Sequence, residues 1–246
     1  MNEILKATLI GLFFGTFGTT LGGIIGIKLK KSSNKFLGFI LAFASGLMIT
    51  IVSFELIPEA LQIASISVVL LGIIVGIIAM IICDILVGKK FSLTAPTNKT
   101  ASLLKTGIIV SIGLAIHNFP EGLAIGSGFE ASIKLGLSLA IAICLHDIPE
   151  GIAMAVPMKN GGIKTSRVIY YVILSGITTG LGAFLGAIVG GISQNIIAIC
   201  LSFAAGAMTY IVSGELIPES NQLYHGKTTA IGNIIGFIIG ILAMNI

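Results

Sequence analysis

Residues 41–62 read LAFASGLMITIVSFELIPEALQ, and residues 201–222 read LSFAAGAMTYIVSGELIPESNQ. At an offset of 160 residues, the two stretches are identical at 14 of 22 positions, and both contain the run ELIPE. Shared hydrophobic composition does not by itself produce the same run, with two glutamates and a proline, at the same place in two apolar segments. We therefore interpret the two stretches as copies of an internal repeat.

The composition around this repeat is that of a membrane protein. The chain of 246 residues has 14 basic and 10 acidic residues, a formal net charge of +4, and 55% hydrophobic residues. Charged residues make up 10% of the chain, against about 25% in an average soluble domain. So few charges cannot cover a water-soluble surface. The composition excludes a soluble enzyme, a nucleic-acid-binding domain and a disordered chain, and it indicates the lipid bilayer as the main surroundings.

Polar residues divide the chain into eight apolar segments, each long enough to cross a bilayer as a helix. A hydrocarbon core requires roughly 20 apolar residues per helix. The predicted fold is therefore all-α, a polytopic membrane protein of eight transmembrane helices in one domain covering residues 1–246. The expected spans are residues 4–27, 36–58, 65–88, 105–128, 133–157, 168–191, 195–218 and 228–245.

The basic residues predict how the chain is oriented. Twelve of the 14 fall at loops on one side of the predicted membrane, and only Lys6 and Lys134 fall on the other side. Loops rich in lysine and arginine stay in the cytoplasm. We therefore expect a protein of the cell membrane with both termini outside, and a long cytoplasmic loop at residues 89–104.

The two copies of the repeat lie in spans two and seven, which cross the membrane in opposite directions. Repeats inverted in the membrane plane are typical of secondary transporters, in which related units move against each other to give alternating access. Spans one to three and six to eight would be the two units, with spans four and five between them. The predicted arrangement is therefore 3+2+3.

Acidic residues of the repeat fall near the two membrane faces. Glu55 and Glu59 come at the outer end of span two, and Glu215 and Glu219 come at the inner end of span seven. We predict that these pairs mark the two mouths of one pathway. The alternative is that they are helix-end acids at the interface, with Pro58 and Pro218 terminating the helices. Asp84 is interpreted as a helix-end residue.

The most informative polar residues lie deep in spans four and five. Residues 117–122 read HNFPEG and residues 146–151 read HDIPEG, an offset of 29. Each motif places histidine and glutamate at i and i+4, on one face of a helix. Ionisable groups inside a membrane are costly and mark functional sites. The candidate metal ligands are His117, Asn118, Glu121, His146, Asp147 and Glu150.

This set of side chains favours a bound divalent cation. Two imidazoles and two carboxylates from facing helices suit tetrahedral Zn²⁺, and mixed nitrogen and oxygen ligation would also accept Fe²⁺, Mn²⁺, Co²⁺ or Cd²⁺. Asn118 and Asp147 would serve a second ion or the next step of the path. The alternative is a proton relay or a hydrogen-bond network without a metal.

The paired motifs HNFPEG and HDIPEG in adjacent spans resemble the Zrt/Irt-like (ZIP) family of divalent metal transporters, in particular its bacterial GufA-like branch. The resemblance implies a 3+2+3 inverted repeat, often dimeric, that moves Zn²⁺ and related cations into the cytoplasm. It implies a first metal on His117, Glu121, His146 and Glu150. It implies a second metal on Asn118 and Asp147, with the two glutamates bridging.

The chain departs from the bacterial pattern in span six. That branch often reads SGLAEPLGA, whereas residues 175–183 read SGITTGLGA. Thr179 therefore stands where a glutamate would help to hold the second metal, and a hydroxyl is a poorer cation ligand than a carboxylate. We accordingly expect one tightly held ion.

Two functional classes remain to be compared. In the leading hypothesis a divalent cation, chiefly zinc, enters past Glu55 and Glu59, sheds water at the central motifs and leaves past Glu215 and Glu219. The chain has no P-loop, so transport would follow the gradient of the ion or be coupled to another ion. The alternative is an intramembrane metal-dependent enzyme, which needs a metal with an open position and a general base, as in HExxH. Neither motif contains HExxH, so we expect that the protein is not an enzyme.

Overall fold

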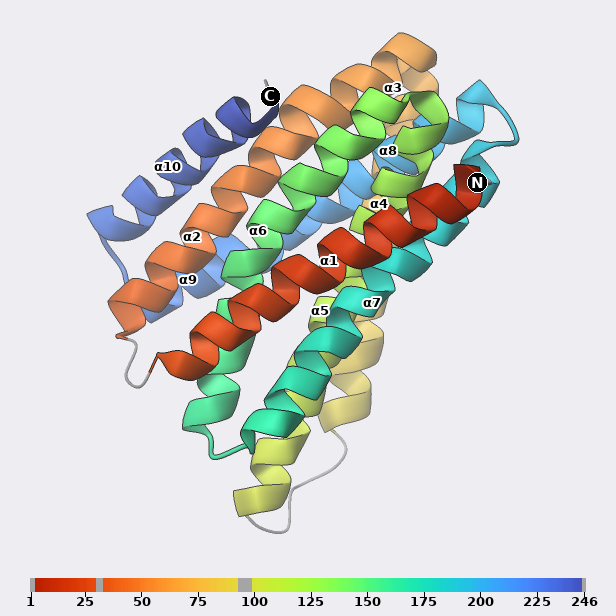
Figure 1. The fold of residues 1–246 in the computed structure, drawn as a ribbon. Helices are drawn as coiled ribbons and strands as arrows, with labels where there is room; N and C mark the ends of the chain where they lie inside the picture. Colours follow the sequence, from red (N-terminus) through yellow and green to blue (C-terminus); the bar gives the residue numbers. More distant parts are fainter. Residues whose placement is uncertain (1–2, 30–32, 93–98, 245–246) are drawn as a thin grey trace.

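The computed structural model describes residues 3–29, 33–92 and 99–244, without the side chains of residues 87–92 and 99–111. All the regular structure in these residues is helical (Figure 1), as the sequence predicts. The α-helices are α1 Glu3–Lys28, α2 Asn34–Ile51, α3 Ile57–Ile63, α4 Ile66–Ser92, α5 Lys99–Ala131, α6 Ile133–Asn160, α7 Thr165–Gly190, α8 Gln194–Ile211, α9 Ile217–Leu223 and α10 Lys227–Met244. Two π-helical turns, η1 Val52–Leu56 and η2 Val212–Leu216, join α2 to α3 and α8 to α9.

Seven stretches of the described chain are long and apolar enough to cross a membrane, which fits a multi-pass membrane protein. They are Glu3–Lys28, Asn34–Ile63, Ile66–Leu86, Ile133–Asn160, Thr165–Gly190, Gln194–Leu223 and Lys227–Met244. The remaining predicted span, residues 105–128, falls on α5, whose first side chains lie outside the described residues. The predicted loop at residues 89–104 is shorter than expected, because α4 continues to Ser92 and α5 begins at Lys99. Its residues 93–98 are outside the described part.

The long helices lie side by side, and successive long helices, such as α5 and α6, run in opposite directions (Figure 1). The first turn of α1 and the last turn of α10 lie at the same end of the bundle. The connections from α1 to α2, from α6 to α7 and from α9 to α10 lie at the other end, which we call the basic end. The described basic residues at these connections are Lys28, Lys35, Lys159, Lys164, Arg167 and Lys227.

The internal repeat is reproduced residue for residue in the backbone. In both copies an α-helix of 18 residues is followed by a π-helical turn of 5 and an α-helix of 7 residues, at an offset of 160. Pro58 and Pro218, at the start of α3 and α9, have no N–H to donate to the preceding turn, and the wider π-turn absorbs this defect. The prolines therefore do not terminate the helices, which extend to Ile63 and Leu223, beyond the predicted ends at residues 58 and 218.

Glycines determine which helices of the two copies pack together. A Cβ atom on Gly46 of α2 would collide with the carbonyl oxygen of Asn233 on α10. At the positions 160 residues away, a Cβ on Gly206 of α8 would collide with the carbonyl oxygen of Ile73 on α4. Small residues allow such close approach of helices in membranes. Each unit therefore packs its second helix against the last helix of the other unit, so that the two units are intertwined.

The other four helices hold the two central motifs. A Cβ atom on Gly22 of α1 would collide with the carbonyl of Ile148 on α6, and one on Gly182 of α7 would collide with the carbonyl of Phe119 on α5. Gly22 and Gly182 are again 160 residues apart, and Phe119 and Ile148 are equivalent residues of HNFPEG and HDIPEG. Each motif is thus held by a close backbone contact with a helix of one unit, α1 for HDIPEG and α7 for HNFPEG, and the two contacts are related by the internal repeat.

Candidate metal centre

The six candidate ligands of the two central motifs are all buried. Successive helices α5 and α6 are antiparallel and are joined at Ser132, whose side chain caps α6 by accepting a hydrogen bond from the N–H of Leu135. This short connection sets the two motifs side by side in the bundle. The buried ligands, each at most 5% exposed, are His117, Asn118, Glu121, His146, Asp147 and Glu150.

Four of these side chains form one compact cluster. Glu121, His146, Asp147 and Glu150 each offer a ligand atom, and these atoms all lie within 4.8 Å of one another. His146 Nε2 is 2.9 Å from Glu121 Oε1 and 3.6 Å from Asp147 Oδ1. We refer to these four residues as the central cluster.

Most of the oxygen atoms of the central cluster have no hydrogen-bond partner in the described structure. These are Glu121 Oε2, both carboxylate oxygens of Asp147 and both of Glu150. Buried polar atoms in proteins are nearly always hydrogen-bonded, and buried carboxylates require an opposite charge. Three buried acids facing one imidazole therefore form a site whose chemistry suits a divalent cation.

His117 lies next to the central cluster and is turned toward a different partner. Its Nδ1 donates to the carbonyl oxygen of Gly113 at 3.2 Å, and its Nε2 is 3.8 Å from Glu215 Oε2. The expectation from the motif spacing places His117 and His146 in one set of four ligands. The structure instead groups Asp147 with His146 and the two glutamates, and places His117 between this cluster and Glu215.

Asn118 is held by α7. Its Nδ2 donates to the carbonyl oxygen of Ser175 at 3.1 Å and lies 3.2 Å from Ser175 Oγ, which leaves Asn118 Oδ1 without a partner in the described structure. Thr179, one turn after Ser175, is fully buried, and its Oγ1 has no described partner. The Thr179 side chain lies against Gly15 of α1. Sequence reasoning did not identify Ser175, although a serine one turn before Thr179 shares its helix face.

Glu55 and Glu59 line a cavity of about 490 Å³. They belong to η1 and α3, and α3 lies at the end of the bundle opposite the basic end (Figure 1). Residues at the start of α6, among them Ser138, complete the wall of this cavity. Ser138 Oγ donates a hydrogen bond to Glu55 Oε1 at 2.7 Å. We call this cavity the outer pocket. Its lining contains none of the six central candidates.

Glu215 and Glu219 line a second cavity, of about 270 Å³, which we call the inner pocket. Its wall also includes His117 and Glu150, so it reaches the central cluster. Asp84 of α4 joins the wall, where its Oδ2 accepts a hydrogen bond from Tyr210 Oη at 2.9 Å. Asp84 thus lines the inner pocket, whereas from the sequence it is interpreted only as a helix-end residue. The available signal was a carboxylate inside an otherwise apolar segment.

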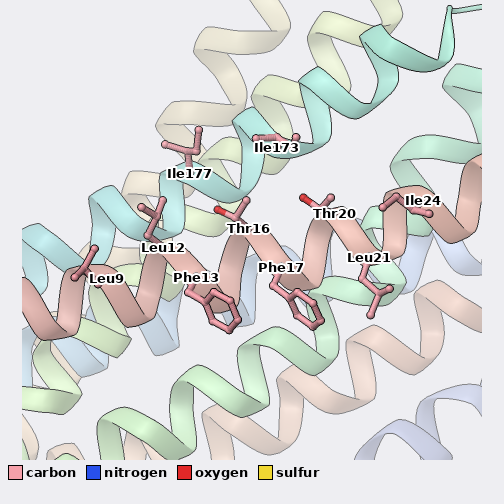
Figure 2. A pocket seen from close by; sticks show the side chains of 10 residues that line it. All are labelled: Leu9, Leu12, Phe13, Thr16, Phe17, Thr20, Leu21, Ile24, Ile173 and Ile177. Atoms are coloured by element: carbon pink, nitrogen blue, oxygen red, sulfur yellow. The ribbon is translucent and has the colours of Figure 1, made fainter.

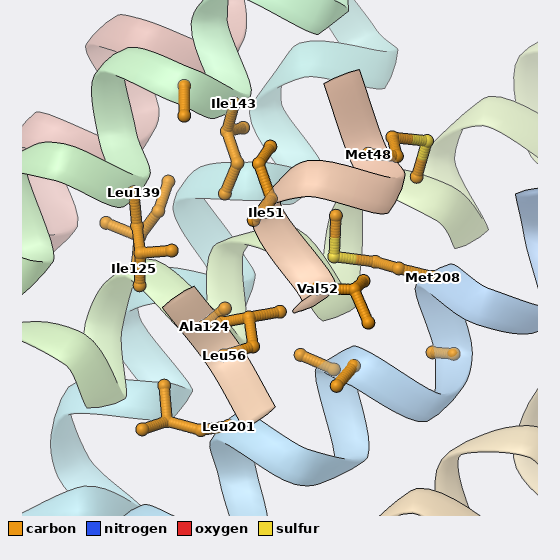
Figure 3. Packing of buried hydrophobic residues seen from close by; sticks show 14 of the residues in the cluster. Met48, Ile51, Val52, Leu56, Ala124, Ile125, Leu139, Ile143, Leu201 and Met208 are labelled. Carbon is orange, nitrogen blue, oxygen red and sulfur yellow. The ribbon is translucent and has the colours of Figure 1, made fainter. Parts of the chain in front are cut away.

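Buried apolar side chains follow the outer pocket along α6, and we call them the apolar layer. Along α6, Leu139 and Ile143 come after Ser138 and before His146, and neither is exposed. Ile51 of α2 and Ile125 of α5 pack against them in the same buried group (Figure 3). Of the four residues of the central cluster, Glu150 lines the inner pocket, and none lines the outer pocket.

A larger cavity, of about 680 Å³, lies between α1 and α7 and has a different character (Figure 2). Its wall consists of leucine, isoleucine and phenylalanine side chains, together with the hydroxyls of Thr16 and Thr20. It contains no acidic residue or histidine, so its lining is unsuited to a metal ion.

The chain is similar to known zinc transporters. The family model "ZIP Zinc transporter" matches residues 90–246. The zinc transporter ZupT of Salmonella paratyphi A is 30% identical over 229 residues, which cover 90% of this chain and 89% of that protein. The zinc transporter ZIP11 of Xenopus tropicalis is 35% identical over 161 residues, covering 61% of this chain, and human ZIP11 is 37% identical over 138 residues, covering 53%. The matched parts make up 48% and 40% of these two ZIP11 proteins, so the chain spans about half their length or less.

Proposed function

This chain belongs to the ZIP family of zinc transporters, and on that premise we propose that it carries divalent metal cations, chiefly zinc, across the cell membrane into the cytoplasm. The observation that carries the proposal is the central cluster, in which three buried carboxylates face one imidazole. A set of hard oxygen ligands with one nitrogen ligand suits Zn²⁺ and also Fe²⁺, Mn²⁺, Co²⁺ or Cd²⁺.

The metal ligands follow from the cluster and from its neighbours. Glu121, His146 and Glu150 would hold the transported ion. In the conformation described, Asp147 would join them as a ligand. His117 would then pass the ion toward Glu215. Asn118 would contribute its free Oδ1. Thr179 offers a hydroxyl in place of a carboxylate, which supports one tightly held ion.

The pathway runs from the outer pocket to the inner pocket. The cation would be attracted by Glu55 and Glu59, would lose its water at the central cluster and would leave past Glu215 and Glu219. Asp84 adds a carboxylate to this exit. The apolar layer of Leu139 and Ile143 supports an inward-open conformation, so that entry requires the layer to part.

The membrane topology belongs to the same proposal. We take α5 as the fourth of eight spans, which gives the 3+2+3 arrangement in one domain. The basic end would lie in the cytoplasm, because positively charged connections are retained there, and both termini would then be outside. Exposed apolar side chains along α4 and α10, such as Leu71, Ile78 and Ile238, support contact with lipid. A homodimer is proposed by resemblance to the family.

The alternative function, an intramembrane metal-dependent enzyme, has less support. The relatives reported above are named as transporters. Acidic pockets at both ends of the bundle suit a path through the protein better than a one-sided catalytic cleft. Hydrolysis of a peptide or lipid without cation flux would favour the enzyme.

The test is uptake of ⁶⁵Zn²⁺ into proteoliposomes of purified protein. We expect saturable uptake that is lost to a similar degree in His117→Ala, in His146→Ala and in the double variant, because the ion meets both imidazoles on one path. The third histidine, His225, is exposed, and His225→Ala is the matched control that keeps uptake. Fe²⁺, Mn²⁺, Co²⁺ and Cd²⁺ are then added as competitors. Absence of uptake of every one of these metals by folded protein would refute the transporter.

A further inference from the structure

We propose that Lys134 is a tethered cation of the outer pocket that opposes the entering metal ion and sets how tightly it is captured from outside. The inference rests on the proposed function and adds to it a residue that determines affinity. Lys134 lies in the first turn of α6 and lines the outer pocket together with Glu55 and Glu59. Its ammonium group therefore shares one cavity with the two carboxylates that the ion meets first.

Lys134 is free to act on these carboxylates. It interacts electrostatically with Glu55, yet no salt bridge within 4.0 Å fixes it to an acid in the described part of the chain. The other basic residue at this end, Lys6, is 3.9 Å from Glu3 on its own helix and does not line the pocket. Lys134 is thus the one basic side chain among the described residues that line the outer pocket, and Lys6 is a natural control.

The pseudo-symmetry of the fold shows that the two pockets are charged differently. Met244 of α10 lines the outer pocket, and the residue 160 positions earlier, Asp84, lines the inner pocket. In the described residues the outer pocket has two carboxylates and one ammonium. The inner pocket has an imidazole, that of His117, and four carboxylates, those of Asp84, Glu150, Glu215 and Glu219. Because of this difference in charge, the outer pocket should bind the metal ion weakly and the inner pocket should attract it more strongly toward the cytoplasmic side.

The size of the effect follows from Coulomb's law. A unit charge about 8 Å from a doubly charged ion in water changes its local concentration about fivefold. Because the outer pocket is open to solvent, salt should screen most of this effect at ionic strengths where the Debye length is well below that distance. Dependence on salt therefore separates an electrostatic role of Lys134 from a structural one.

The experiment measures the KM of ⁶⁵Zn²⁺ uptake by intact bacterial cells, in which only the outer pocket meets the external metal. Lys134→Met removes the charge and keeps most of the length of the side chain. Lys134→Arg keeps the charge, and Lys6→Met removes the control charge. Uptake is measured at about 0.01 M and about 0.5 M ionic strength, where the Debye lengths are about 30 Å and about 4 Å.

We expect Lys134→Met to lower the KM about fivefold at low salt, with little change in maximal rate, and to approach wild type at high salt. Lys134→Arg and Lys6→Met should behave as wild type throughout. An unchanged KM in Lys134→Met at low salt, or a shift of the same size at both salt concentrations, overturns the proposal while leaving zinc transport intact. Absence of uptake by folded wild-type protein overturns the proposed function and this inference with it.

Discussion

Replacing Gly22 by alanine should destabilise the protein and disturb the central cluster. The added Cβ atom would collide with the carbonyl oxygen of Ile148 and would lie 2.9 Å from its carbonyl carbon and 3.0 Å from its Cα. Carbon atoms in contact prefer a separation of about 3.5–4.0 Å, so α1 and α6 would have to separate by at least half an ångström. No side-chain rotation relieves this clash, because the contacted atoms belong to the backbone.

The expected magnitude follows from this geometry. Inserting a methyl group into a close-packed interface costs about 1–3 kcal/mol of unfolding free energy. For a chain of this size, a loss of 2 kcal/mol lowers Tm by about 4–8 °C. Ile148 lies between Asp147 and Pro149 in HDIPEG, so the same displacement should weaken Zn²⁺ binding. Both quantities are measured on detergent-purified protein, by thermal unfolding and by calorimetric titration with Zn²⁺.

Two further glycines make the test decisive. Gly182→Ala, the pseudo-symmetric change against the carbonyl of Phe119, should lower Tm by a similar amount. A Cβ atom on Gly113 meets no atom of the described residues within 4 Å. Gly113→Ala should therefore leave Tm unchanged or raise it, since alanine favours helix by up to about 1 kcal/mol. If Gly22→Ala and Gly113→Ala melt at the same temperature, the close crossing of α1 and α6 does not constrain the fold.

Three other changes test the site and its surroundings. Glu121→Gln removes a carboxylate 2.9 Å from His146. The loss of a charged interaction of about 1.5–3 kcal/mol should weaken Zn²⁺ binding, measured by calorimetry, roughly ten- to hundredfold. An unchanged affinity would exclude Glu121 as a ligand. Asp84→Asn removes one of four carboxylates from the inner pocket and should lower the maximal rate of uptake about fivefold, with the external KM unchanged. A raised KM with an unchanged maximal rate would place Asp84 on the entry side. Ile143→Ala truncates a fully buried side chain of the apolar layer and should cost about 2–5 kcal/mol, seen as a lower Tm; a Tm equal to that of wild type would show that the layer is loosely packed.

The repeat and its consequences for the backbone could be predicted from the sequence to a large extent. The shared ELIPE run predicted two equivalent helices, and the structure repeats them residue for residue. The π-turns could not be predicted in the same way, because Pro58 is compatible with a helix end, a kink or a wider turn, and packing decides among them. The intertwining of the units was also hidden, since Gly46 and Gly206 indicate a close contact without indicating its partner.

The sequence predicted which residues supply the ligands of the central region, but not which of them lie together in one cluster. The i, i+4 spacing in each motif places histidine and glutamate on one face, yet it leaves open how far each helix is rotated about its axis. That rotation directs Asn118 to Ser175 and His117 to Glu215, and it brings Asp147 into the cluster. Asp84 was missed because its hydrogen-bond partner, Tyr210, lies 126 residues further along the chain.

The intertwined packing also sets the order in which the protein is completed during synthesis. Thr50 of α2 donates a hydrogen bond to the carbonyl of Phe237 on α10, 187 residues later, at 3.1 Å. A ribosome that adds 5–20 residues per second needs about 10–40 s to make that stretch. Until Phe237 has been made, the surface of α2 that carries Gly46 and Thr50 lacks its native partner, α10. A nascent chain cut short before α10 therefore displays an open helix face, which membrane quality control can recognise.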